Sequence, residues 1–331
     1  MACLVRVCAN EGEEVVAINL RDLYGDKMRI NAPKEICLYE EKNLIKTLKF
    51  IQDIYEIVNV SSEIIKINFA NTTNITAAAS VVLFAHINYL QLMTKPNRFI
   101  FENLALNDTE HKDFLTKIYA KALKAGSVQA LNGLETSNNL YQSGILPHEK
   151  LPYLKVFFRN IRMQLGEESL LLPTISLLET AVYEALLNVH HHAYLNVQGE
   201  PTRWWQYLYF NPTKKTLTFI IYDLGIGIIE SFIKHSEKQT TSLFHSKTDI
   251  LKETLKPGVS RWNQIERGNG LADMMKPTLS DVAVWILTNQ VHLEKSPQFN
   301  IDVCYETSYS LPGTLVEWHF ELRNNNENEK N

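Results

Sequence analysis

A polar stretch without apolar periodicity, residues 126–150, interrupts a chain in which strand-like and helix-like patterns otherwise alternate. It contains the run NGLETSNN, and two prolines bracket the run PHEKLP near its end. Such a composition is typical of a segment that links domains. The 331 residues also suit about two domains. We therefore predict a domain at residues 1–125, a linker at 126–150, a second domain at 151–322 and a disordered tail at 323–331.

The first domain alternates strand and helix patterns, which indicates an α/β fold with helices packed on a sheet. Apolar residues between 44 and 58 recur close to every 3.6 residues, as expected for a helix. Asp108 is a candidate N-cap for the last helix of the domain. Strands are predicted at 14–20, 35–39, 64–70 and 98–104, and helices at 44–58, 76–93 and 108–125.

The second domain begins with a helix-rich stretch, residues 151–194. Two strand-like runs follow, and Asn211 and Pro212 between them predict a hairpin. Later strands are predicted at 282–289, 300–306 and 314–322.

Charge, cysteine content and hydropathy argue against a nucleic-acid-binding protein, a disulfide-rich scaffold and a membrane-spanning helix. The net charge is −4, so no basic excess indicates nucleic acid or an acidic membrane as the main partner. The four cysteines form no C-x-x-C pair and are too sparse for a disulfide scaffold, so we expect reduced thiols in a cytoplasmic protein. The most apolar run, residues 77–90, is shorter than the roughly 20 residues that cross a membrane and contains His86 and Asn88. We expect a buried helix there.

The run YEALLNVHHHAYLN, residues 183–196, places Glu184, Asn188 and His192 at intervals of four on a predicted helix. Four residues make slightly more than one helical turn, so these polar side chains lie along one stripe. The two adjacent leucines of the run are expected to be buried. The stripe is either a solvated face or a surface that converges on one ligand.

The other histidines of this run, His190 and His191, invite comparison with a zinc site. Adjacent helical residues point about 100° apart, so neighbouring histidines cannot share one metal ion. We assign both to the surface or to a helix contact.

The segment YDLGIGI, residues 222–228, ends an apolar strand with Asp223, Gly225 and Gly227. The carboxylate can accept a hydrogen bond from an exocyclic amine, and the glycines allow a flat ring to approach the backbone. A tight turn is the alternative interpretation.

Two further segments carry glycine. In RGNGLADMM, residues 267–275, two glycines precede a predicted helix whose free N–H groups would attract phosphate. An ordinary loop before a helix is the alternative. In LPGTLVEW, Gly313 and Thr314 open the last strand, which alone indicates only a turn.

Together, in this order and after a hairpin, the four segments resemble the Bergerat ATP-binding fold of the GHKL superfamily. That superfamily includes type II topoisomerase ATPase subunits, heat-shock chaperones, histidine kinases and anti-sigma-factor kinases. The resemblance covers roughly residues 150–322 and implies an α/β sandwich with helices on one face of a mixed sheet. The helix stripe with Ala193 resembles the N-box, D-L-G-I-G and G-N-G-L the two glycine boxes, and Gly313 with Thr314 the closing G-T pair.

The resemblance implies ATP and Mg²⁺ as ligands. Asn188 would hold the Mg²⁺ through its carboxamide oxygen, and Glu184 would act as general base on the attacking water. Asp223 would bind the adenine amino group, which Thr314 would support, while backbone N–H groups of the second glycine box would bind phosphate. The implied nucleotide-binding residues are Asn188, His192, Asp223, Gly225, Gly227, Arg267, Gly268, Asn269, Gly270, Leu271 and Thr314.

The resemblance also places an ATP lid at residues 228–267, a polar segment rich in serine and threonine and interrupted by proline and glycine. Arg267 would neutralise phosphate charge. Lys256 and Arg261 are alternatives for that role, but for both we favour an ordinary solvated position.

The first domain resembles the STAS domains of anti-anti-sigma factors, with IIKINFANTTNITAAASVVLF, residues 64–84, at its centre. In that family a serine at the start of the following helix receives phosphate from a GHKL kinase. The corresponding residues here are Thr76, Ala77, Ala78 and Ala79, so the acceptor serine is missing and Thr76 is expected to cap the helix. We interpret the domain as a protein-interaction or intramolecular control module, with a structural scaffold as the alternative.

Three functions stay open. The first is a Mg²⁺-dependent ATPase with slow turnover that acts as a switch. In it the two domains, or the two protomers of a homodimer, re-pack when nucleotide binds, and the protein partner is unidentified. The second is a serine/threonine protein kinase of the anti-sigma-factor type; prolines around His148 disfavour the dimerisation helix of a histidine kinase. The third is a nucleotide-dependent binding module without turnover, as in a bacterial stress or defence system.

Overall fold

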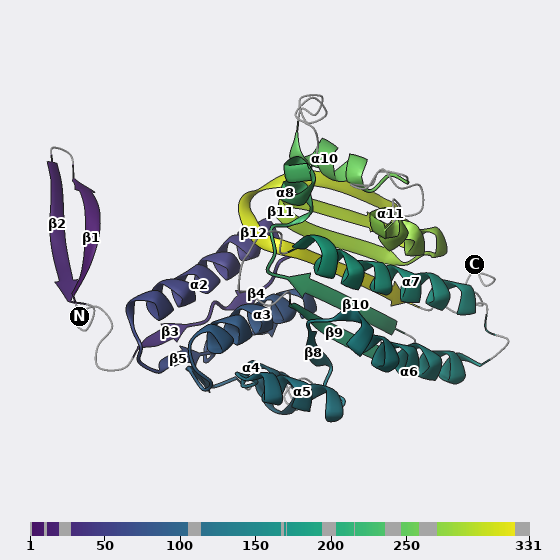
Figure 1. Ribbon diagram of the computed structural model, residues 1–331, viewed down its shortest axis with the longest axis horizontal. Coiled ribbons are helices and arrows are strands. Elements are labelled where there is room, and N and C mark those ends of the chain that lie inside the picture. Colours follow the sequence, from purple (N-terminus) through teal and green to yellow (C-terminus); the bar gives the residue numbers. More distant parts are fainter. Residues whose placement is uncertain are drawn as a thin grey trace. The chain divides into compact units, whose positions relative to one another are not determined.

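A computed structural model shows a mixed α/β protein with two compact units, Met1–Asn139 and Leu140–Asn331 (Figure 1). The structure describes residues 2–9, 12–19, 28–104, 114–166, 169, 171–193, 203–214, 216–235, 246–257 and 270–321, with the backbone only for 2–9, 12–19, 114–116, 192 and 235. The predicted tail and the predicted N-cap Asp108 lie outside these residues. Within them, every helix is too short or too polar to span a bilayer.

The unit Met1–Asn139 contains a parallel sheet in the order β3-β5-β7. Parallel neighbours need a crossover connection, and the two long helices α2 and α3 provide it. A separate antiparallel hairpin and a short parallel pair, β4 with β6, complete the described strands. The elements are β1 (Ala2–Ala9), β2 (Gly12–Asn19), β3 (Arg29–Asn31), β4 (Glu35–Ile36), α2 (Glu41–Val60), β5 (Ile65–Asn68), β6 (Asn74–Ile75), α3 (Ala77–Met93), β7 (Phe99–Glu102), η1 (Phe114–Tyr119), α4 (Ala120–Leu123) and α5 (Val128–Thr136).

Helix α3 is buried along nearly its whole length, which confirms the expectation for the most apolar run of the chain. Two of its polar residues form hydrogen bonds inside the unit: His86 Nδ1 lies 2.9 Å from the Tyr55 hydroxyl, and Asn88 donates to the carbonyl of Ala125. Thr76 stands at the N-cap position, but its hydroxyl forms no capping hydrogen bond, so the expected side-chain cap is wrong.

The unit Leu140–Asn331 is built on a five-stranded sheet in the order β11-β12-β10-β9-β8. Every described pair of neighbours in it is antiparallel, whereas we expected a mixed sheet. The reason is that β9 and β10, and then β11 and β12, follow each other as hairpins. The elements are β8 (Tyr141–Gly144), α6 (Pro147–Leu165), α7 (Leu172–Asn188), η2 (Val189–Ala193), β9 (Trp204–Asn211), β10 (Thr216–Asp223), α8 (Ile228–His235), α10 (Lys247–Thr254), α11 (Gly270–Met275), η3 (Lys276–Ser280), β11 (Ala283–Ser296), η4 (Pro297–Phe299) and β12 (Ile301–Glu321).

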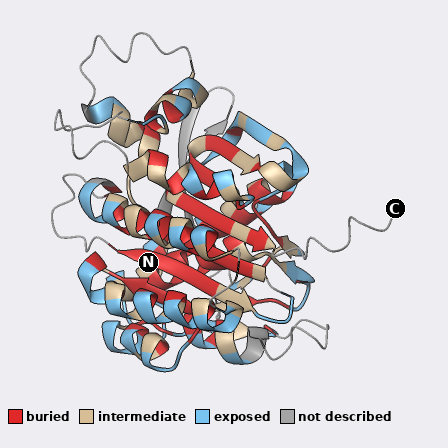
Figure 2. Ribbon diagram, turned by 90° about the vertical axis from the view of Figure 1, so that its right-hand side faces the viewer, coloured by how far each residue is buried: buried red, intermediate tan, exposed pale blue. Residues whose placement is uncertain are grey.

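Helices α6 and α7 lie side by side across one face of this sheet (Figure 1). Alternate strand residues point to that face, so β10 contributes Leu217, Phe219 and Ile221 to the shared core. The strands are accordingly buried for much of their length (Figure 2). On α7, Leu186 is fully buried, but Leu187 is 39% exposed because it lies about 100° further round the helix. The expectation that both leucines are buried is therefore wrong for Leu187.

The predicted linker, residues 126–150, is regular structure for much of its length. Ser127 caps α5 by accepting a hydrogen bond from the backbone N–H of Ala130 at 3.2 Å. Strand β8 then adds to the sheet, and α6 begins at Pro147. The division between the units falls between α5 and β8.

The prolines around His148, which we expected to disfavour a dimerisation helix, lie within the helix α6. Pro147 occupies the first turn of α6, where no intrahelical N–H bond is needed, and Pro152 is tolerated inside the helix. Through Leu154 and Phe158 the helix packs into the core of its own unit. The helix therefore belongs to this unit's core and does not stand apart as a dimerisation helix would.

Candidate functional site

The polar stripe of α7 meets the GNGL segment at Gly270, the first residue of α11. A Cβ atom added to Gly270 would lie 2.8 Å from Glu184 Oε2 and 3.6 Å from Asn188 Oδ1. Asn188 Nδ2 also donates a hydrogen bond to Met274 Sδ at 3.1 Å. Two segments that are far apart in the sequence thus place a carboxylate, a carboxamide and a side-chain-free backbone position together.

Glu184 has a pKa above the usual range of a glutamate. Partial burial is the main cause, and the nearby carboxylate of Asp273 adds to it, while Lys276 acts in the opposite direction. Lys276 is itself held by Asp273, with 2.6 Å between Nζ and Oδ1. A raised pKa brings this carboxylate closer to the operating range of a general base near neutral pH.

Asp223 ends β10 in a buried position. Its side chain accepts a backbone hydrogen bond from Gly225 at 2.8 Å and another from Thr314. Both bonds favour the charged form, yet burial outweighs them and raises the pKa of Asp223 to about 7. The carboxyl group therefore changes protonation state close to neutral pH.

Gly225 joins the Asp223 loop to the end of the α7 stripe. The backbone N–H of Ile226 donates to the carbonyl oxygen of Ala193 at 2.8 Å, and a Cβ on Gly225 would overlap that same carbonyl. The chain after Asn188 is a wider π turn, η2, rather than the α-helix we predicted. The side chain of His192 lies outside the described residues, so its place on the stripe stays a prediction.

The closing G-T pair lies against Asp223. Thr314 is the direct partner of Asp223 in the β10–β12 register. Gly313 has φ +76°, and a Cβ there would overlap the backbone carbonyl of Asp223. The predicted strands at 300–306 and 314–322 are one strand, β12, which runs through Gly313.

Thr288 and Asn289 belong to the same cluster and were not predicted. Thr288 Oγ1 accepts from the N–H of Ile228 at 3.0 Å and lies 3.1 Å from Thr314 Oγ1. Asn289 donates to the carbonyl of Ile226 at 2.9 Å and fills the space beside Gly227. The β11–β12 register shifts at Asn289. Such a shift could not be found from the sequence, because it is visible only once the pairing of the two strands is known.

Several residues that we predicted for nucleotide binding or for the lid lie elsewhere in the structure. Leu271 is partly buried and packs against the hydrophobic core. Lys256 pairs with Glu253 at 2.6 Å on the surface, as favoured for it. The predicted lid contains two helices, α8 and α10, whose Ile229 and Leu251 belong to the core. Four predicted residues lie outside the described part of the chain: Arg261, Arg267, Gly268 and Asn269.

His190 and His191 are exposed, with ring centroids 5.0 Å apart. Among the described residues, no three His, Cys, Asp or Glu side chains come together as a metal-binding group. The chain matches no protein-family model and no curated protein sequence.

The close approach at Gly313 gives a stability prediction. Gly313→Ala is expected to destabilise the protein by about 3 kcal/mol or more, because the new methyl group meets a backbone carbonyl at a left-handed φ. For a unit of this size the melting temperature would fall by roughly 6–12 °C. Gly133→Ala in α5 is the control, since nothing lies within 4 Å of its Cβ, and its melting temperature should stay the same or rise slightly. Equal melting temperatures for both variants would contradict this close packing.

Proposed function

We propose that the unit Leu140–Asn331 binds ATP with Mg²⁺ and hydrolyses it slowly, as its resemblance to the GHKL superfamily implies. One observation carries the proposal: segments that resemble four ordered boxes of one nucleotide site also contact one another. Glu184 and Asn188 meet Gly270, Gly225 meets the end of the same helix stripe, and Gly313 meets Asp223. A chance set of turn glycines has no reason to converge in this way.

The side chains fit a magnesium-bound nucleotide. A carboxylate and a carboxamide oxygen are hard donors, and Mg²⁺ usually takes only one or two protein ligands besides phosphate oxygens and waters. Asn188 would hold the ion, which would neutralise charge on the phosphates when bound. The absence of a side chain at Gly270 lets both donors approach the backbone of this segment closely.

Two carboxylates take different roles in this proposal. Asp223 accepts a hydrogen bond from the adenine amino group, and its buried position makes that bond strong. Glu184 orients a water molecule and takes its proton, for which its raised pKa is suited.

The proposed ATPase acts as a switch for protein interaction. The backbone of Ile228, at the start of the proposed lid, donates a hydrogen bond to Thr288 in the candidate site, so the lid is linked directly to that site. The unit Met1–Asn139 would be the interaction module that resembles STAS domains. Ser80, near the start of α3, is 2% exposed and bonds to the carbonyl of Ala77, so it is no accessible phosphate acceptor.

The direct test is incubation of the purified protein with Mg²⁺ and ATP labelled in the γ-phosphate. Slow release of labelled phosphate supports the ATPase. Label transferred to a protein substrate would instead indicate a kinase, and bound ATP without either product would indicate a binding module. Absence of ATP binding would contradict the proposal altogether.

Gly270→Ala separates catalysis from folding. The added methyl group would displace the Glu184 carboxylate, whose Oε2 lies 2.8 Å from its position, but a flexible side chain can move aside. We expect a melting temperature within about 2 °C of the wild type and ATP turnover at least about tenfold lower, because a displaced base loses its geometry. Unchanged turnover would argue against Glu184 as the base.

A further inference from the structure

The side-chain amide of Asn188 has a defined orientation. Its NH₂ group donates to Met274 Sδ, while its oxygen accepts no hydrogen bond from any described residue. A Cβ atom added to Gly270 would lie 3.6 Å from this oxygen and 3.8 Å from the amide nitrogen, so the whole amide group is close to Gly270. The carboxamide oxygen, the atom that would bind a cation, therefore accepts no hydrogen bond within the described part of the chain.

The sulfur atom matters because the two ends of a carboxamide are nearly the same in shape. Rotation by half a turn would present NH₂ to the cation in place of the oxygen. A thioether sulfur can accept a hydrogen bond but has no proton to donate. It therefore stabilises only the orientation with the nitrogen toward Met274, and it disfavours the reversed one.

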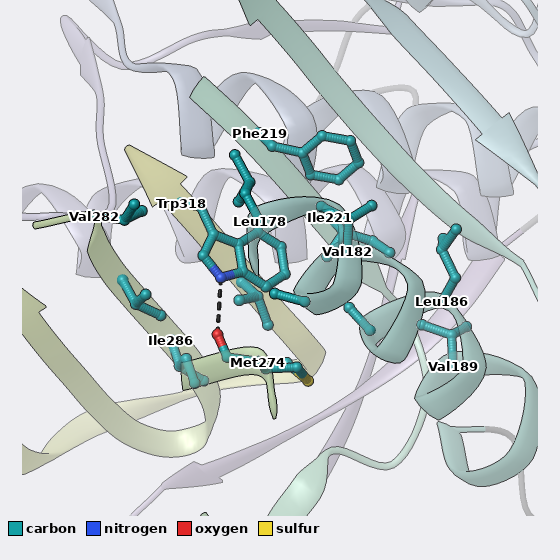
Figure 3. Close-up of a cluster of buried hydrophobic side chains, with 14 of the residues drawn as sticks. Leu178, Val182, Leu186, Val189, Phe219, Ile221, Met274, Val282, Ile286 and Trp318 are labelled. Carbon is teal, nitrogen blue, oxygen red and sulfur yellow. Dashed lines mark hydrogen bonds between the residues drawn. The ribbon is translucent and has the colours of Figure 1, made fainter. Parts of the chain in front are cut away.

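Met274 is held firmly in place. Its backbone carbonyl accepts a hydrogen bond from Trp318 Nε1 at 2.9 Å, as Figure 3 shows. Met274 is 2% exposed and Trp318 is fully buried among residues of α7 and the sheet. The main chain of Met274 is thus anchored to β12, and its buried side chain holds the sulfur beside the Asn188 amide.

We propose that Met274 is a positioning residue that orients the Asn188 amide so that its oxygen faces the magnesium ion. The inference rests on the proposed function, because it concerns how the same site receives its metal. It adds a residue that is absent from the nucleotide-binding residues implied by the resemblance and that lies near the end of the short helix α11.

The test compares the affinity of the full chain for fluorescently labelled ATP in excess Mg²⁺ and in EDTA. Met274→Leu keeps the volume and removes the acceptor. We expect it to reduce the Mg²⁺-dependent gain in affinity by about threefold to tenfold, the scale of one net hydrogen bond, and to leave affinity in EDTA unchanged. The adjacent Met275→Leu is the matched control and should behave as the wild type.

A second background separates orientation from packing. In Asn188→Asp both outer atoms are oxygens, so orientation no longer matters and Met274→Leu should have no further effect. An equal loss in the wild-type and Asn188→Asp backgrounds, or in EDTA, would show that Met274 only packs the core. An unchanged Mg²⁺-dependent gain in Met274→Leu would also overturn the inference. If the wild type bound no ATP, the proposed function itself would fail, which is a distinct result.

Discussion

Glu184→Ala is expected to lower ATP turnover by about 10²- to 10⁴-fold, the usual contribution of a general base. ATP binding should survive, because Asp223 and Asn188 remain. The raised pKa of Glu184 adds a pH signature: a base is inactive when protonated, so turnover should fall with acidification at a higher pH than an ordinary glutamate would give.

The measurement is steady-state phosphate release across a pH series, with nucleotide affinity determined in parallel. Glu184→Gln should lose turnover like the alanine variant, since an amide cannot take the proton. Glu179→Ala is the control on the same helix, because Glu179 is occupied by Arg162 and Tyr183. If Glu184→Ala turned over ATP at the wild-type rate, Glu184 would have no part in the reaction.

Asp223→Asn is expected to weaken ATP binding by about 10- to 100-fold, because a hydrogen bond to a buried charged acceptor is lost. Acidification should imitate the substitution in the wild type. The pKa of Asp223 is about 7, so ATP affinity should fall between pH 8 and pH 6, and it should stay flat in Asp223→Asn. Competition binding over this range measures both effects. An unaltered ATP affinity in the variant would rule out Asp223 as the adenine residue.

The same substitution should change stability in the opposite direction. The folded pKa of Asp223 is about 7 against a usual value of 3.8, so between these values the folded state keeps a proton that the unfolded state releases. The stabilisation from that proton is complete below about pH 4 and is lost as pH rises toward 7, on the order of a few kcal/mol. Asparagine cannot ionise and escapes this loss. Urea unfolding should therefore favour the variant more at pH 8 than at pH 4, and parallel pH curves would contradict this.

The sequence predicted elements whose signals are local. The period of α2, the apolar α3 and the hairpin of β9 and β10 depend on neighbouring residues, and each is present. The spacing of Glu184 and Asn188 also placed both on one side of α7, where they meet Gly270. In these cases the spacing of residues along the chain defines which side of the element they occupy: a spacing of four for a helix and of two for a strand.

Tertiary context decided the rest. Thr288 and Asn289 join the site because β11 changes register there, and no local pattern marks that shift. From the sequence alone Met274 is an ordinary core methionine, because only the packing of α11 on α7 brings its sulfur to Asn188. The segment at 126–150 looked like a linker because α5 buries only Leu131 and Leu134, too few residues for a clear period. Beyond Asn188 the helix widens into a π turn, which no local residue pattern indicates.

A crystal structure of the full chain with Mg²⁺ and a non-hydrolysable ATP analogue tests the central claim most directly. The account predicts one nucleotide in the unit Leu140–Asn331, with its adenine amino group bonded to the Asp223 carboxylate and its magnesium ion on the Asn188 oxygen. Density for the analogue at any other place, or a chain without nucleotide at saturating concentration, would contradict it.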